Sequence, residues 1–392
     1  MQWQAIKSYL PYKMKRQVRE LFISTTLVNL ALAMVMIFEP IYLYKIGYNL
    51  QSIMLFYLIT YIFYFLLMPI GAKFAKRYGY EMSIFVGTIL FILFYLALFF
   101  IARYPILFYL SPIILAIQKT FYWPAYHADF ARFSDDSEEG RELSSMTVAT
   151  SLVYVIGPAI AGFIVVNWGY GALFTLASVI FLASNIPTLI TREEFAPSLF
   201  SYGDTYRNLF NRKNRRSFLA YAGYGEELVV LVIWPIFISL IITNMFDLGL
   251  IVALATLVTT IITFYIGKLT DYKNKRPVLY LGSAIYAISW YIRLFITTTV
   301  GVFFVDSLSR LGKNVVTIPM TAITYENAKD LQADKHHHLM SGVVFFEMSL
   351  VIGKLFAILV IYGLLFLVSA DIIAFKLTFI LAGGMTLLYM LL

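Results

Sequence analysis

The sequence predicts an all-α integral membrane protein with 12 transmembrane helices in two pseudo-symmetric six-helix bundles. Of its 392 residues, 60% are hydrophobic and 13% are charged, whereas soluble domains carry roughly 25% charged residues. A water-soluble fold of this length could not bury so many apolar side chains. Long apolar runs and an internal repeat, described next, give the number and grouping of the helices.

The apolar runs are long enough to cross a bilayer, because a helix needs roughly 20 residues to span ~30 Å of hydrocarbon. In the first half of the chain they cover residues 20–44, 50–72, 81–102, 105–131, 143–167 and 170–190. In the second half they cover 217–242, 247–268, 277–298, 299–327, 339–364 and 371–392. The first run is too long for a signal peptide and lacks a cleavage pattern, so we expect it to be retained.

The two halves of the chain repeat each other at an offset of 195 residues. A polar stretch divides the chain, so we expect bundles at 1–190 and 217–392 and a linker at 191–216. The matching pairs fall on corresponding helices and are Pro40 with Pro235, Gly87 with Gly282, and Pro124 with Pro319.

The basic residues lie mostly on one side of the expected helices. Five Lys and Arg residues precede the first run, six lie between the sixth and seventh runs, and the opposite side holds only Lys45 and Arg103. Such a bias marks cytoplasmic loops, so we expect both termini in the cytoplasm and the chain in the cell membrane. The net charge of +8 is thereby explained without a nucleic-acid partner.

Residue types that commonly hold metals or cofactors are scarce. The chain has no cysteine, which excludes disulfides and thiolate metal sites. A histidine triplet, His336 to His338, lies in a polar loop, where we expect it to be solvated. No Gly-rich nucleotide-binding loop ending in Lys-Ser/Thr is present, and we expect no cofactor, no metal and no enzymatic activity.

The loop after the eighth run carries a recognisable motif. It begins Gly267-Lys268-Leu269-Thr270-Asp271 and continues through Lys273 and Arg276. This pattern resembles the signature loop of the major facilitator superfamily, in which Gly, two or three residues and Asp precede basic residues. The matching loop of the first half keeps Gly71, Arg77 and Gly79, but Lys76 stands where the family usually has Asp.

A second short motif lies in the fifth run, where Gly157, Pro158 and Gly162 resemble the glycine-proline motif of the family's proton-coupled exporters. The resemblance implies a secondary transporter that binds its substrate between the two halves. It also implies that the signature loops act as gating latches. Asp271 would meet the positive end of the next helix dipole. A cytoplasmic loop that merely follows the charge bias is the alternative.

Several charged residues fall within the expected helices, where each needs a partner or a wet cavity because an isolated charge costs at least ~2.5–3.5 kcal/mol. The resemblance implies that the first, fourth, seventh and tenth helices line the cavity, so Lys119 and Lys313 would face each other near Glu226 and Glu227. Glu227 is our first candidate for the proton carrier and Glu226 the second; a static buried salt bridge is the alternative. Further pathway candidates are Glu39, Glu347 and Lys354.

The function that follows is alternating-access transport of a small molecule, coupled to protons, by a protein that functions as a monomer. We favour efflux of amphipathic compounds. Uptake of a sugar or an organic anion is the alternative, and the two central lysines favour the anion. A membrane enzyme or lipid scramblase is a remote alternative. Substrate identity, direction and stoichiometry do not follow from the sequence.

Overall fold

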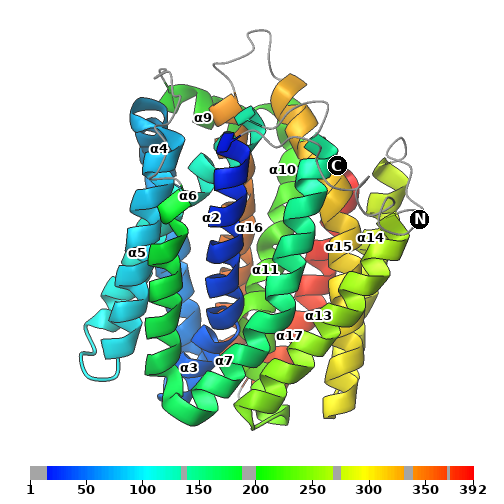
Figure 1. Ribbon diagram of the computed structural model, residues 1–392. Coiled ribbons are helices and arrows are strands. Elements are labelled where there is room, and N and C mark those ends of the chain that lie inside the picture. The colour runs from blue at the N-terminus through cyan, green and yellow to red at the C-terminus, as the bar shows by residue number, and fades with distance from the viewer. Residues whose placement is uncertain (1–15, 134–138, 188–199, 268–274, 331–338, 369–370) are drawn as a thin grey trace, which may run out of the picture.

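Long helices dominate the structure, a computed structural model that describes residues 16–133, 139–187, 200–267, 275–330, 339–368 and 371–392 (Figure 1). No strand occurs within these ranges. The elements of the first half are α2 (Arg16–Val35), α3 (Phe38–Lys45), α4 (Leu50–Tyr78), α5 (Tyr80–Phe100), α6 (Leu107–Phe133) and α7 (Glu139–Ser184). The predicted helical membrane protein is confirmed at this level.

The second half begins with short segments and continues with long helices. The short segments are α9 (Tyr202–Leu209), η1 (Arg212–Asn214), α10 (Arg215–Ala222), η2 (Gly223–Gly225), α11 (Glu226–Leu228), η3 (Val229–Ile233) and α12 (Trp234–Ile241). The remaining elements are α13 (Met245–Gly267), α14 (Lys275–Ile292), η4 (Arg293–Phe295), α15 (Thr299–Asp330), α16 (Leu339–Leu367), α17 (Asp371–Leu387) and η5 (Leu388–Leu391).

Within the described residues, nine stretches are long and apolar enough to cross a membrane by length and composition. They are 19–45, 50–78, 80–100, 149–184, 212–241, 245–262, 275–295, 340–367 and 371–391. The stretch 149–184 contains two helices, because Gly169 breaks α7 with a φ of 81°, a value that glycine adopts readily.

Two prolines explain why the first and seventh apolar runs are not single regular helices. Proline lacks an N–H and clashes with the carbonyl four residues earlier. The chain breaks between α2 and α3 just before Pro40, and a π-helical turn, η3, precedes Pro235. This irregular stretch begins just after Glu226 and Glu227, and it therefore shapes the part of the chain that carries these two acids.

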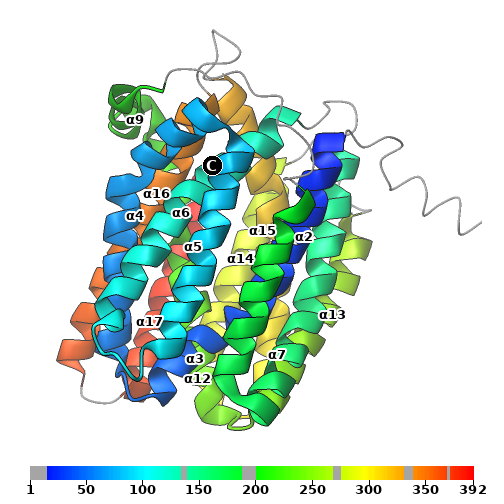
Figure 2. The same cartoon turned by 60° about the vertical axis from the view of Figure 1, so that its left-hand side comes forward.

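The ends of the helices define two faces. We call the end that carries α9, the start of α2 and the C-terminal turn η5 the linker face (Figure 1). At the opposite face, α3 packs against α12. Along the sides, α4 lies beside α16 and α7 lies beside α13 (Figure 2), so helices distant in sequence join the two halves of the chain.

Glycines allow α7 and α13 to approach closely. A Cβ added at Gly249 would collide with the backbone carbonyl of Pro158, and one added at Gly162 would collide with the carbonyl of Met245. Small residues at such crossings are typical of membrane helix pairs, since lipid gives no hydrophobic drive for association. The Gly157–Pro158–Gly162 motif thus has a packing role in this structure.

We predict that Gly249→Ala destabilises the protein, because the added methyl group overlaps backbone that cannot rotate away. Overpacking of this kind costs about 1–3 kcal/mol, so the apparent melting temperature in detergent should fall by several degrees. Gly384→Ala is the matched control, because no atom lies within 4 Å of its added Cβ and alanine favours helix. Equal melting temperatures for the two variants would contradict the close approach.

Candidate functional site

A cavity of about 790 Å³ lies between the two halves of the chain. Its lining comes from α2 to α7 of the first half and from the elements η2 to α16 of the second. The wall combines aromatic rings, threonines and charged side chains. The charged side chains are Glu39, Lys119, Glu227, Arg293, Asp306, Arg310, Lys313, Glu347 and Lys354.

The cavity extends toward the linker face. Its lining includes Thr324 of α15 and Gly342 of α16, which lie near the linker-face ends of these helices. Thr317 in the wall is exposed, whereas Trp234 and Ile238, toward the opposite face, are buried. At the opposite face α3 packs against α12, and the cavity-lining residues there are buried, so the described residues have the geometry of a state accessible from one side.

Glu226 lies behind the wall of the cavity and is completely buried. Its carboxylate accepts hydrogen bonds from the Nζ of Lys313 at 2.5 Å, the hydroxyl of Tyr286 at 2.6 Å and the hydroxyl of Tyr389 at 2.8 Å. A buried carboxylate is tolerated when it is paired and its oxygens are satisfied. Glu226 is therefore a fixed anchor for Lys313.

Glu227, by contrast, lies in the cavity wall between two lysines. Its Oε1 is 3.4 Å from the Nζ of Lys313, and its Oε2 is 2.9 Å from the Nζ of Lys354. The side chain keeps 28% of its surface exposed. The predicted meeting of Glu226, Glu227 and Lys313 occurs, and α16 adds Lys354 to the same cluster.

Glu39 of α3 is held by the first half of the chain alone. The hydroxyl of Tyr57 donates to its Oε1 at 2.9 Å, and the hydroxyl of Tyr95 lies 3.4 Å from its Oε2. Glu39 is buried yet contributes to the cavity wall. It is thus fixed by two phenols from α4 and α5.

Lys119 does not lie within 4 Å of either glutamate of α11. It lines the cavity from α6, and its ammonium lies 5.9 Å from the centre of the Tyr61 ring. Lys119 and Lys313 therefore have different surroundings, although they occupy almost equivalent places in the repeat. Position 118, the exact counterpart of Lys313 at the 195-residue offset, is Gln118, which is buried.

Glu347 of α16 contacts the first half of the chain. It accepts a hydrogen bond from the hydroxyl of Tyr64 in α4 at 2.8 Å, and the Nε2 of His127 in α6 lies 3.2 Å away. Lys354, seven positions further along α16, pairs with Glu227. Glu347 therefore connects the two halves.

A second charged cluster, around Arg293, includes partners that the sequence reasoning missed. The guanidinium of Arg293 lies between the rings of Trp234 and Trp290, 4.1 and 3.8 Å from their centres. Asp306 accepts hydrogen bonds from Trp234 at 3.0 Å and from Arg310, four positions away on α15, at 2.7 Å. The repeat offered a signal for the two tryptophans. At the 195-residue offset, Trp234 and Trp290 stand at the positions of Glu39 and Tyr95, which contact each other in the first half.

The predicted gating residues are only partly described. Asp271 and Lys273 lie outside the described residues, Gly267 ends α13, and Arg276 is exposed at the start of α14. His336 to His338 also lie outside the described residues.

The corresponding segment of the first half is described in full. A Cβ on Gly71 would collide with the carbonyl of Thr120, so α4 and α6 touch there. Gly79 has a φ of 111° and joins α4 to α5, whereas Arg77 is exposed. Lys76 is buried, with its Nζ 3.5 Å from the hydroxyl of Tyr80.

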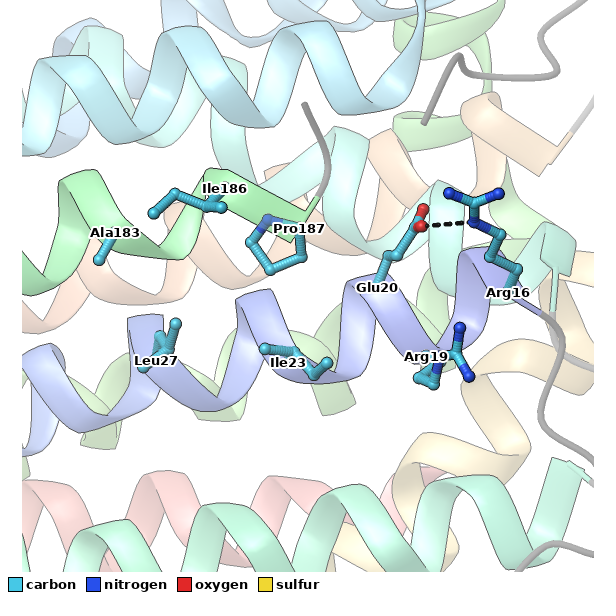
Figure 3. A pocket seen from close by; sticks show the side chains of 8 residues that line it. All are labelled: Arg16, Arg19, Glu20, Ile23, Leu27, Ala183, Ile186 and Pro187. Carbon is cyan, nitrogen blue, oxygen red and sulfur yellow. Dashed lines mark hydrogen bonds and ion pairs between the residues drawn. The ribbon is translucent and has the colours of Figure 1, made fainter. Parts of the chain in front are cut away.

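A separate pocket lies at the linker face between α2 and the end of α7 (Figure 3). Arg16, which pairs with Glu20 at 2.9 Å, and Arg19 lie at one end, and the apolar side chains of Ile23 and Leu27 lie at the other. None of the residues that line it also lines the central cavity.

The model of the Major Facilitator Superfamily matches residues 21–246, more than half of the chain. The chain belongs to the Major Facilitator Superfamily. A search of curated proteins finds no match. Members of this superfamily are transporters and not enzymes, so this superfamily member is a multi-pass membrane transporter that binds a small-molecule substrate.

Among the described residues, no group of three or more His, Asp or Glu side chains could hold a metal ion.

We predict that Asp306→Ala strongly destabilises the protein. The substitution leaves Arg293, which is 1% exposed, without its carboxylate, and breaking a buried ion pair costs about 3–5 kcal/mol. Thermal unfolding in detergent should show a clear loss of stability. Asp247→Ala is the control, because Asp247 is exposed at the start of α13; a similar small effect at both positions would refute the role given to Asp306.

Proposed function

We propose that this superfamily member is a proton-coupled secondary transporter that works by alternating access. The observation that carries the proposal is the position of Glu227, a cavity-lining carboxylate shared by two lysines. An intramembrane carboxylate in contact with a wet cavity is a typical element of proton relays.

The cluster of Glu226, Glu227, Lys313 and Lys354 carries two negative and two positive charges when all four groups are ionised. A proton on Glu227 would leave one excess positive charge and would release Lys354 from its partner. Glu226 would keep Lys313 in place, because its carboxylate is satisfied by three donors. Protonation at one position would thus change the charge that a substrate meets.

The membrane arrangement we propose has 12 crossings in two six-helix bundles, 1–190 and 217–392, joined by the linker 191–216. The nine apolar stretches supply ten crossings when α7 is divided at Gly169, and α6 and α15 supply the other two. Equivalent close contacts support the repeat, since Gly87 abuts α6 and Gly282 abuts α15. We place both termini in the cytoplasm of a cell that carries the monomer in its plasma membrane.

The signature loops would act as latches at the linker face. Asp271, Lys273 and Arg276 would form the latch of the second half after Gly267, while Gly71, Arg77 and Gly79 shape its counterpart. In the state described here the cavity would be open to the cytoplasm. Opening to the other side would require α3 and α12 to separate.

For the direction of transport we favour efflux of amphipathic compounds, which the aromatic cavity wall and the Gly157–Pro158–Gly162 motif support. Proton-coupled uptake of an organic anion is the second candidate. Lys119 favours it, because this cavity-lining cation has no carboxylate within 4 Å among the described residues.

We predict that Glu227→Gln abolishes coupling while substrate exchange persists. In proteoliposomes, labelled candidate substrates should be moved by the wild type in response to a pH gradient. The variant should exchange the same substrates across the membrane, but a pH gradient should no longer drive net movement. Asp371→Asn, at an exposed position at the start of α17, is the control; full gradient-driven transport by Glu227→Gln would rule out this coupling site.

We also predict that one face of the cavity can be labelled selectively. The chain has no cysteine, so single substitutions need no background removal. Thr324→Cys should react with an impermeant maleimide applied from the linker side in inside-out vesicles, whereas Ile238→Cys should react from neither side in this state. Faster labelling of Ile238→Cys than of Thr324→Cys would show that the cavity opens in the other direction.

A further inference from the structure

Lys119 differs from the other basic side chains in the cavity wall. The others pair with acids, Arg293 and Arg310 with Asp306 and Lys313 and Lys354 with Glu227. Lys119 has no carboxylate within 4 Å among the described residues, and its one described contact is with the face of the Tyr61 ring. Its charge therefore faces the cavity without a contacting counter-ion.

Glu39, the other charged cavity-lining residue of the first half, is not a contacting counter-ion for Lys119. Both of its oxygens are engaged by phenols, Oε1 by Tyr57 and Oε2 by Tyr95. These two hydrogen bonds hold the carboxylate of Glu39 in position, away from direct contact with the Lys119 ammonium. The charge of Glu39 acts on Lys119 through space, but no described carboxylate contacts the ammonium directly. A positive charge that faces a cavity with low-dielectric walls raises the local concentration of anions.

Tyr61 adds a hydrogen-bond donor at the same position. Its ring lies near both Lys119 and Lys354, whose ammonium groups are 5.9 and 5.3 Å from the ring centre. Its hydroxyl makes no hydrogen bond with any described residue. A donor hydroxyl beside an ammonium that no carboxylate contacts provides two of the groups that bind a carboxylate.

The surfaces next to Lys119 are apolar and aromatic. Leu115 and Trp123 lie one turn before and after Lys119 on α6, hence on the same face of the helix, and both line the cavity. Phe346 of α16 and Tyr126 of α6 belong to the same wall. An apolar lining with a few polar groups favours a ligand with an apolar body and one oriented polar group.

We propose that the substrate is an amphipathic organic monoanion whose acidic group is bound by Lys119 and the Tyr61 hydroxyl, with its apolar body against Trp123 and Phe346. This inference rests on the proposed transport function and specifies its substrate class. It holds for either direction of transport, and it assigns to Lys119 a binding role separate from the coupling role of Glu227.

The test measures binding to the purified protein in detergent, without a membrane or a pH gradient. The probes are 1-naphthoate, 1-naphthalenemethanol and 1-naphthalenemethylamine, which share one aromatic body and differ in charge. We expect the wild type to bind naphthoate most tightly. Lys119→Gln should weaken naphthoate binding by about tenfold or more, as expected for loss of a charge-assisted contact, and should leave the affinity for the alcohol unchanged.

Lys119→Arg should restore part of the affinity for naphthoate, whereas Lys376→Gln, at an exposed position on α17, should have no effect. Unchanged binding of the alcohol to Lys119→Gln shows that the cavity is still folded. Preference of the wild type for the amine or the alcohol, equal naphthoate binding by Lys119→Gln, or no naphthoate binding at 10 mM would each overturn the proposal. Proton coupling, tested by Glu227→Gln in proteoliposomes, would stand or fall separately.

Discussion

Charge neutralisation inside an apolar environment is the constraint on which this structure depends. Removing an ionised group from water is costly unless a partner or retained water compensates. The chain meets the requirement by tying acids and bases from different helices together, as Glu226 does with Lys313 of α15. These pairs fix helices α11, α15 and α16 relative to one another, and they place the remaining charges along a shared cavity.

The same constraint separates fixed charges from adjustable ones. Glu226 and Arg293 are buried, and each contacts several fixed groups. Glu227 and Lys119 face the cavity with fewer contacts. The fixed groups stabilise the fold, and in the function we propose the adjustable groups meet the proton and the solute. Stability and the proposed transport roles thus fall on neighbouring but different residues.

Apolar run length predicted most of the helices from the sequence, because the length of a membrane-spanning helix follows directly from the thickness of the bilayer. The grouping of Glu226, Glu227 and Lys313 also followed, since spacing and family resemblance placed them on cavity-lining helices. The contacts of Glu347 with Tyr64 and His127 could not be predicted, because the residues are 283 positions apart in one case and depend on how α4 and α16 cross. The immediate contacts of Lys119 could not be predicted either, because an equivalent position in a repeat does not determine which neighbouring side chain is long enough to reach it.

The glycine contact between α7 and α13 has a mechanical consequence. Where Gly249 meets the carbonyl of Pro158 and Gly162 meets that of Met245, the two helices touch through their backbones. In the proposed alternating-access cycle, movement along these backbone contacts would require fewer rotamer changes than movement along a contact between large side chains. Large side chains at these positions would have to repack whenever α7 moved against α13, and they would therefore slow the conformational change of each transport cycle.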